Sequence, residues 1–193
     1  PLIYLSIPWA ISIHTVTAFL YAGLPDRYFW LSALMAASFL ASAFAAGPAL
    51  LIILALIVRK FTKFDPGKDA IQALGKTVTY AMVANVFFLG LKIFTAAYSQ
   101  IPGYLYPMKY LYFGIDDANN LVSIMWASNV LALVSLVMLI IPSLRKNEKI
   151  LMLACAILFL SLWIDKGFGL IVGGFVPNPF KKVMEYWPTM PET

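Results

Sequence analysis

Long apolar stretches are the feature that most limits what this chain can fold into. Hydrophobic residues make up 62% of the sequence and charged residues 12%, whereas soluble domains average about 45–50% apolar and about 25% charged residues. A chain this apolar cannot cover itself with polar surface, so its solvent is lipid. The stretches reach about 20 residues, the length of a membrane-spanning helix and too long for a barrel strand. The sequence therefore predicts an all-α integral membrane protein.

The apolar stretches predict a bundle of five transmembrane helices that forms a single domain over residues 1–193. We expect the helices at about residues 2–21, 28–58, 75–98, 120–141 and 150–175, followed by a Pro-rich tail at 176–193 on the outer face. The first residue is Pro1, and no basic segment typical of a signal peptide precedes the first apolar stretch. We therefore expect this sequence to be the later part of a longer chain.

The charges in the loops predict the orientation of the helices. The loop at 59–69 carries four basic and two acidic residues, and the loop at 142–149 carries three basic and one acidic residue. Basic loops stay on the cytoplasmic side of a membrane. Five helices then place Pro1 inside and Thr193 outside. The net charge of +5 is loop charge near the membrane and does not indicate nucleic-acid binding.

His14 is the only histidine in the chain, and it lies within the first apolar stretch. Hydrocarbon penalises ionisable groups, so such a residue inside a membrane helix is by default a candidate functional residue. The alternative is structural, because an imidazole can also join two helices by a hydrogen bond. The sequence leaves both interpretations open.

Three further charged residues fall at a similar depth. The predicted orientation places Lys92, Asp165 and Lys166, together with His14, in the outer half of the bilayer. We expect Lys92 and Asp165 to form an ion pair, because an unpaired charge at this depth costs about 2.5–3.5 kcal/mol, and we expect Lys166 to extend outward along its aliphatic stem. Such a pair either only joins two helices or borders a polar pocket, open to the outer face, in which His14 and Asp165 exchange protons.

The sequence predicts no metal centre in this chain. Cys155 is the single cysteine, so no internal disulfide and no cysteine cluster for zinc or an iron–sulfur centre can form. One histidine cannot supply both axial ligands of a bis-histidine haem. We expect neither a haem nor an iron–sulfur centre here.

Three stretches resemble the NrfD/PsrC family, the membrane subunits of polysulfide-reductase-like respiratory complexes. They are Ser12-Ile13-His14-Thr15-Val16-Thr17 with the preceding Pro8, the small-residue run at 39–47, and Trp163-Ile164-Asp165-Lys166. The end of the chain, 166–177, is similar to the subset from sulfate- and sulfur-metabolising organisms that includes the DsrP subunit of the sulfite-reductase-associated transmembrane complex. The resemblance covers nearly the whole chain but only the later half of a typical member, so we expect half of a larger two-bundle protein. Lys92 departs from the family pattern, because relatives carry an acidic residue late in the helix that corresponds to the third predicted helix.

The resemblance implies a subunit of a prokaryotic cytoplasmic (inner) membrane complex that binds menaquinone or menaquinol near the outer face. Such a subunit exchanges electrons with a docked ferredoxin-like iron–sulfur subunit, and multihaem cytochromes and further membrane subunits are additional expected partners. His14 is the candidate base for the quinol hydroxyl, because the pKa of histidine lies nearest neutrality, and Asp165 orients the site or relays protons. Tyr98 and Tyr104, with Tyr21 and Tyr106, either line the mouth of the pocket or serve as ordinary interfacial aromatic residues.

Two other functions remain open. The first is a non-catalytic membrane anchor for periplasmic redox subunits, in which His14 and the charged residues matter only for assembly. The second is a subunit that translocates ions or protons, since broken helices mark such proteins and Gly47-Pro48 is a weak sign of one. The inner half of the third predicted helix, from Leu74 onward, and residues 150–162 of the fifth carry no acidic residue, which argues against a complete proton path.

Overall fold

The computed structural model describes residues 2–24, 27–115 and 119–176, so nearly all of the predicted tail lies outside the described residues. Every regular element in this part of the chain is helical, which confirms the all-α class. The elements, in chain order, are α1 (Leu2–Ala22), α2 (Leu34–Phe61), α3 (Lys68–Ser99), α4 (Pro102–Phe113), α5 (Val122–Ile140), α6 (Pro142–Lys146), α7 (Glu148–Ile164), η1 (Asp165–Val172) and α8 (Gly173–Phe175).

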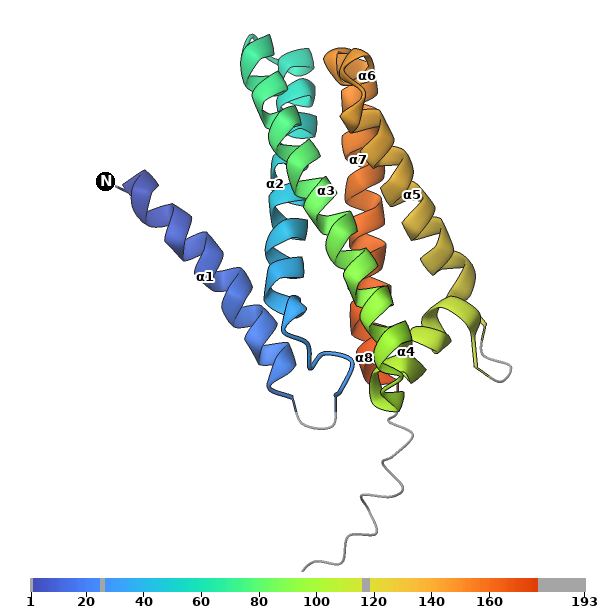
Figure 1. Ribbon diagram of the computed structural model, residues 1–193. Coiled ribbons are helices and arrows are strands. Elements are labelled where there is room, and N and C mark those ends of the chain that lie inside the picture. Colours follow the sequence, from blue (N-terminus) through green and yellow to red (C-terminus); the bar gives the residue numbers. More distant parts are fainter. Residues whose placement is uncertain (1, 25–26, 116–118, 177–193) are drawn as a thin grey trace, which may run out of the picture.

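Four of the long helical segments form the bundle, and the fifth stands partly apart from it. Helices α2, α3, α5 and the continuous α7–η1–α8 segment run alternately up and down, while α1 packs against α2 and leans away from the others (Figure 1). All five are long and apolar enough to cross a membrane. The chain is therefore a multi-pass membrane protein.

The second transmembrane helix starts at Leu34, six residues later than the sequence predicts. The segment before it turns inward instead, and Phe29 and Trp30 are each only 2% exposed. The indole Nε1 of Trp30 donates a hydrogen bond to the carbonyl oxygen of Leu170 at 2.8 Å. Hydropathy alone cannot separate a buried aromatic turn from the first turns of a helix, so the prediction began too early.

Two other boundaries differ from the predictions. Helix α3 begins at Lys68, before the predicted start at about residue 75, so the end of the basic loop is already part of this helix. The aromatic stretch between the third and fourth transmembrane helices contains α4, which starts at Pro102 because proline is well tolerated in the first helical turn. Gly103 lies against the side chain of Tyr28. We call this end of the bundle, where Phe29, Trp30 and Tyr104 gather, the aromatic end.

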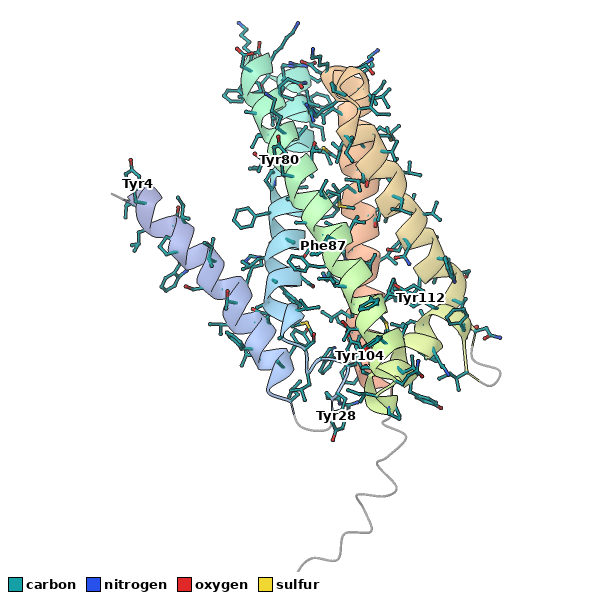
Figure 2. The ribbon with its side chains drawn as sticks, in the orientation of Figure 1. Tyr4, Tyr28, Tyr80, Phe87, Tyr104 and Tyr112 are labelled. Carbon is teal, nitrogen blue, oxygen red and sulfur yellow. The ribbon has the colours of Figure 1, made fainter. Side chains whose placement is uncertain are left out.

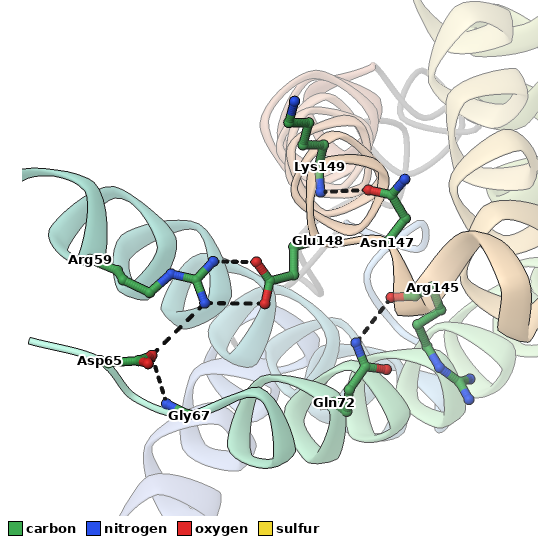
Figure 3. A network of polar contacts seen from close by, with 8 residues as sticks. All are labelled: Arg59, Asp65, Gly67, Gln72, Arg145, Asn147, Glu148 and Lys149. Carbon is green, nitrogen blue, oxygen red and sulfur yellow. Dashed lines mark hydrogen bonds and ion pairs between the residues drawn. The ribbon is translucent and has the colours of Figure 1, made fainter.

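The opposite end, which we call the basic end, is joined by charged and polar contacts between helices (Figure 3). Arg59 at the end of α2 pairs with Glu148 at the start of α7 and with Asp65, at 3.8 Å. Gln72 of α3 donates to the carbonyl oxygen of Arg145 at 3.2 Å. The guanidinium of Arg145 donates to the carbonyl oxygen of Leu139 at 3.1 Å, which places a positive charge at the negative end of α5.

Two apolar clusters fill the bundle, and a layer of polar side chains separates them. The cluster toward the basic end includes Ile52, Met82, Leu139 and Leu158. The cluster at the aromatic end includes Met35, Ala96, Met125 and Leu170. Polar residues from all four helical segments line one cavity near the boundary between these two sets: Ser38 on α2, Asn85 and Lys92 on α3, Ser128 on α5, and Ser161 and Asp165 on α7–η1. This polar layer is where the candidate site lies.

The close contact between Trp30 and Gly174 predicts that a single methyl group at position 174 destabilises the aromatic end. A Cβ at Gly174 would overlap the indole of Trp30, whereas a Cβ at Gly167 would have no heavy atom within 4 Å. Overpacking costs about 1–3 kcal/mol, so Gly174→Ala should lower the thermal unfolding midpoint of the detergent-solubilised protein by several degrees. Gly167→Ala is the matched control and should leave the midpoint within error. Equal midpoints for the two variants would show that Trp30 is not fixed at this position.

Candidate functional site

A small internal cavity occupies the polar layer among α2, α3, α5 and α7–η1. Its volume is about 30 Å³, enough for about two water molecules at roughly 10–15 Å³ each. Its polar lining consists of Ser38, Asn85, Lys92, Ser128, Asn129, Ser161, Asp165 and Lys166. Because each of these groups would be costly to bury in hydrocarbon, the cavity is where the bundle gathers them. We call it the polar cavity.

Lys166 forms the ion pair of this layer. Its ammonium Nζ lies 3.3 Å from Oδ2 of Asp165 and donates a hydrogen bond to the hydroxyl oxygen of Ser38 at 3.2 Å. The same ammonium lies over the ring of Phe39, 5.4 Å from its centroid. The prediction that Lys166 extends outward is therefore wrong, because three groups hold its charge inside the bundle.

The predicted ion pair between Lys92 and Asp165 is also wrong. Both residues line the polar cavity, but the carboxylate of Asp165 pairs with its chain neighbour Lys166. Lys92 instead places its ammonium over the ring of Phe29, 4.3 Å from the centroid, which is a cation–π contact. The sequence gives no sign of this contact. It predicts Phe29 within a helix, whereas Phe29 lies in the inward-turning segment before α2.

A π-helix, η1, sets the positions of the paired charges. It runs from Asp165 to Val172 and has a wider turn than an α-helix. With more residues in each turn, successive side chains diverge less around the axis, so Asp165 and Lys166 can share one side of the segment. π-helical turns are rare and are frequent at functional sites. Neither hydropathy nor residue spacing distinguishes such a turn from an α-helix.

A second, larger space lies beside the polar cavity and contains His14. This hollow has a volume of about 390 Å³ and is open on one side. It is bordered by residues of α1, of α2 and of the α7–η1 segment. Its lining residues are Ile13, His14, Thr17, Phe39, Ser42, Ala43, Ala46, Phe159, Leu162, Trp163 and Lys166. We call it the His14 hollow.

The contact of the imidazole with the backbone determines which nitrogen of His14 is free to act as a base. Nδ1 lies 2.9 Å from the carbonyl oxygen of Ala10. A carbonyl oxygen only accepts hydrogen bonds, so Nδ1 carries the proton, and Nε2 of the neutral ring is the acceptor. In the half-buried His14, Nδ1 therefore donates to the backbone of its own helix, and Nε2 is the nitrogen that can accept a proton from a ligand.

The structure places His14 and Asp165 in adjoining spaces. His14 lines the hollow and Asp165 lines the polar cavity, while Lys166 and Leu162 line both. Lys166 thus stands between the two residues that the sequence singles out. The direct exchange of protons between His14 and Asp165 remains a prediction.

The predicted tyrosines lie elsewhere. Tyr98 is 80% exposed and stacks on Phe94 at a centroid distance of 5.7 Å. Tyr104 is buried at the aromatic end (Figure 2), where it lines a smaller cavity together with Lys92. Burial raises the pKa of Tyr104 to about 12, so its phenol stays protonated at neutral pH. Neither residue lines the His14 hollow.

The other two tyrosines also lie outside this hollow. Tyr21 packs edge-on against Trp30, with ring centroids 4.9 Å apart, and also approaches Phe39. Tyr106 lines a separate hollow at the aromatic end. The structure therefore makes Tyr21 a support for Phe39, which does line the His14 hollow.

Sequence reasoning missed the small polar residues that complete the polar layer. Ser128 and Ser161 exchange hydrogen bonds, each hydroxyl donating to the backbone carbonyl oxygen of the other residue at 2.9 Å. This reciprocal pair joins α5 to α7. The sequence did carry a signal, namely serine and asparagine within apolar helices. Such side chains form hydrogen bonds between neighbouring helices in membranes. Among the described residues, no three His, Cys, Asp or Glu side chains gather at a possible metal site.

Two comparisons with known proteins bear on this arrangement. A family model described as polysulphide reductase, NrfD matches residues 1–177. A protein of Halobacterium salinarum, whose name describes it as a membrane subunit of dimethyl sulfoxide reductase, is 30% identical over 84 residues. That match covers 44% of this chain and 19% of the relative.

The ion pair predicts an asymmetry between single and double substitutions. Asp165→Asn leaves the half-buried ammonium of Lys166 without its carboxylate, and we expect the free energy of unfolding to fall by about 1–3 kcal/mol, which is below the cost for a fully buried pair because this one is partly exposed. Adding Lys166→Met removes the remaining charge and should recover part of the loss. Denaturant unfolding in detergent measures both effects. If the double variant loses the sum of the two single losses, the two charges do not interact.

Proposed function

Because the chain belongs to the polysulphide reductase NrfD family, we propose that it is part of the membrane subunit of a respiratory electron-transfer complex and binds menaquinone or menaquinol in the His14 hollow. The single observation that carries this proposal is the hollow itself, an apolar space beside the bundle with His14 on one wall. The chain spans 19% of the length of the relative that it matches, so the activity and partners of the whole complex belong to the proposal.

The size and lining of the hollow suit a flat apolar ring. Its volume of about 390 Å³ lies within the range of about 300–1,000 Å³ for small-molecule sites, which are mostly apolar with a few polar groups. Phe39, Phe159 and Trp163 supply aromatic surface, and His14 and Lys166 supply polar groups. The open side lets an apolar ligand enter from the lipid, in which menaquinone dissolves.

His14 suits the chemistry that such a ligand supplies. Menaquinol, when bound, supplies two electrons and two protons on oxidation. Nδ1 of His14 donates to the carbonyl oxygen of Ala10, which holds the ring in the tautomer whose Nε2 accepts a proton. Asp165 lies behind Lys166 in the polar cavity, so its role in this proposal is to support the site from inside the bundle.

The proposal also assigns a direction to the subunit in the membrane. Basic segments stay cytoplasmic, so the basic end faces inward, with Pro1 inside and Thr193 outside, in a prokaryotic cytoplasmic membrane. The aromatic end then faces outward, and a ferredoxin-like iron–sulfur subunit docks there and exchanges electrons with menaquinol. The resemblance to the DsrP subset extends the proposal to sulfur metabolism, with a multihaem cytochrome and further membrane subunits as partners.

One observation bears on each alternative function. A non-catalytic anchor requires that another chain fill the His14 hollow with side chains. The polar cavity supports a proton-translocating subunit. Between this cavity and the basic end, however, lies the apolar cluster that contains Ile52, Met82, Leu139 and Leu158, which offers no path for protons. The described residues therefore favour quinone binding over proton translocation.

Replacing His14 tests the proposal most simply. His14→Ala removes the base and should lower the rate of menaquinol-dependent reduction of the partner subunit by about 100-fold or more in the intact complex, the lower end of the roughly 10²–10⁴-fold that general base catalysis contributes. Ser12→Ala is the matched control, because Ser12 lies on the same helix, is exposed and bonds only to its own helix through the carbonyl oxygen of Pro8. Unchanged turnover in His14→Ala, with normal assembly, would refute the quinone-reactive role.

A further inference from the structure

We propose that Lys166 is the second ligand-binding group of the His14 hollow and that Asp165 acts through it as a positioning residue. The bound ligand is then a ring that carries an oxygen at each of two opposite edges, one facing His14 and the other facing the ammonium of Lys166. This inference rests on the proposed function. It adds Lys166 as a hydrogen-bond donor, although the sequence predicts that this side chain extends outward.

The two groups that line the hollow come from different segments of the chain. His14 comes from α1, and Lys166 comes from η1. Residues of α2 line the hollow as well. The two groups therefore reach the hollow from two different segments, both of which pack against α2. A ring with a single polar edge would satisfy only one of them, whereas a ring with oxygens at two opposite edges matches both.

Lys166 is held in place before any ligand binds. A free lysine side chain loses considerable rotamer entropy on binding. Here the ammonium already has Asp165 at 3.3 Å, Ser38 at 3.2 Å and the ring of Phe39 at 5.4 Å. Its position is thus set by the bundle, and little further ordering is required when a ligand oxygen takes one of its three N–H donors. Asp165 is therefore a positioning residue, because it holds the ammonium of Lys166 in place.

More basic than acidic residues lie behind the hollow. The polar cavity is lined by two ammonium groups, Lys92 and Lys166, and one carboxylate, Asp165. The ionisable residues in this lining therefore favour negative charge on a nearby ligand oxygen. Of these three residues only Lys166 lines the hollow as well, since the ammonium of Lys92 lies over the ring of Phe29. This difference provides a matched pair of lysines in one cavity.

The test compares these two lysines in the intact complex. Equilibrium binding of menadione, measured by titration calorimetry in detergent, is read together with the KM and kcat for menaquinol. We expect Lys166→Met to raise the dissociation constant for menadione and the KM at least tenfold, which is about 1.4 kcal/mol, with a smaller change in kcat. Lys92→Met, which removes the same charge from the same cavity, should change both by less than threefold. Lys166→Arg keeps the charge and a donor and should restore most of the affinity.

Each outcome decides between the proposals. If Lys166→Met binds menadione as the unmodified complex does, or if Lys92→Met weakens binding equally, Lys166 is not the ligand's donor and the inference is overturned. If Lys166→Met weakens binding and Lys166→Arg restores it, the inference holds. Loss of assembly in Lys166→Met leaves the Arg variant to decide, because Lys166→Arg with full affinity supports the inference and Lys166→Arg without affinity contradicts it. Unchanged menadione binding in His14→Ala would instead overturn the proposed function itself.

Discussion

Hydrocarbon does not solvate charge, and this constraint gathers the charged side chains of Lys92, Asp165 and Lys166 around one cavity inside the bundle. A lone lysine or aspartate at this depth costs several kcal/mol, so the carboxylate of Asp165 and the ammonium of Lys166 pair, and Ser38 and Phe39 complete the surroundings of the ammonium. The aromatic cluster packs on one side of this layer and the aliphatic cluster on the other. The candidate site lies beside this layer, because Lys166 and Leu162 line both the polar cavity and the His14 hollow.

The hollow exists because α1 does not join the bundle along its whole length. Ala18 is buried, but the side chains of α1 toward its start are largely exposed, and Tyr4 lies at the end of the helix farthest from the other helices (Figures 1 and 2). Its contacts are with α2. A helix that leaned fully against the bundle would fill the space that His14 and Lys166 now border. The tilt of α1 thus leaves the His14 hollow beside the polar layer, and the proposed ligand binds in that hollow.

Hydropathy and loop charge are sufficient to predict the class of the protein and the approximate place of each spanning helix, because bilayer thickness and the cost of buried charge act on composition alone. They also place His14, Lys92, Asp165 and Lys166 at similar depths. They do not give the rotation of a helix about its axis, on which each pairing depends. Thus Lys166 pairs with Asp165 while Lys92 contacts Phe29, and neither the π-helix at 165–172 nor the inward turn at Trp30 has a sequence signal of its own.

The most direct test of ligand binding between His14 and Lys166 is a structure of the intact membrane complex determined by cryo-electron microscopy with a menaquinol analogue bound. We expect density for a flat ring in the His14 hollow, with one ring oxygen within hydrogen-bond distance of the imidazole and the opposite oxygen within hydrogen-bond distance of Nζ of Lys166. Density in the hollow for side chains of a neighbouring subunit, with the analogue bound elsewhere, would contradict this placement.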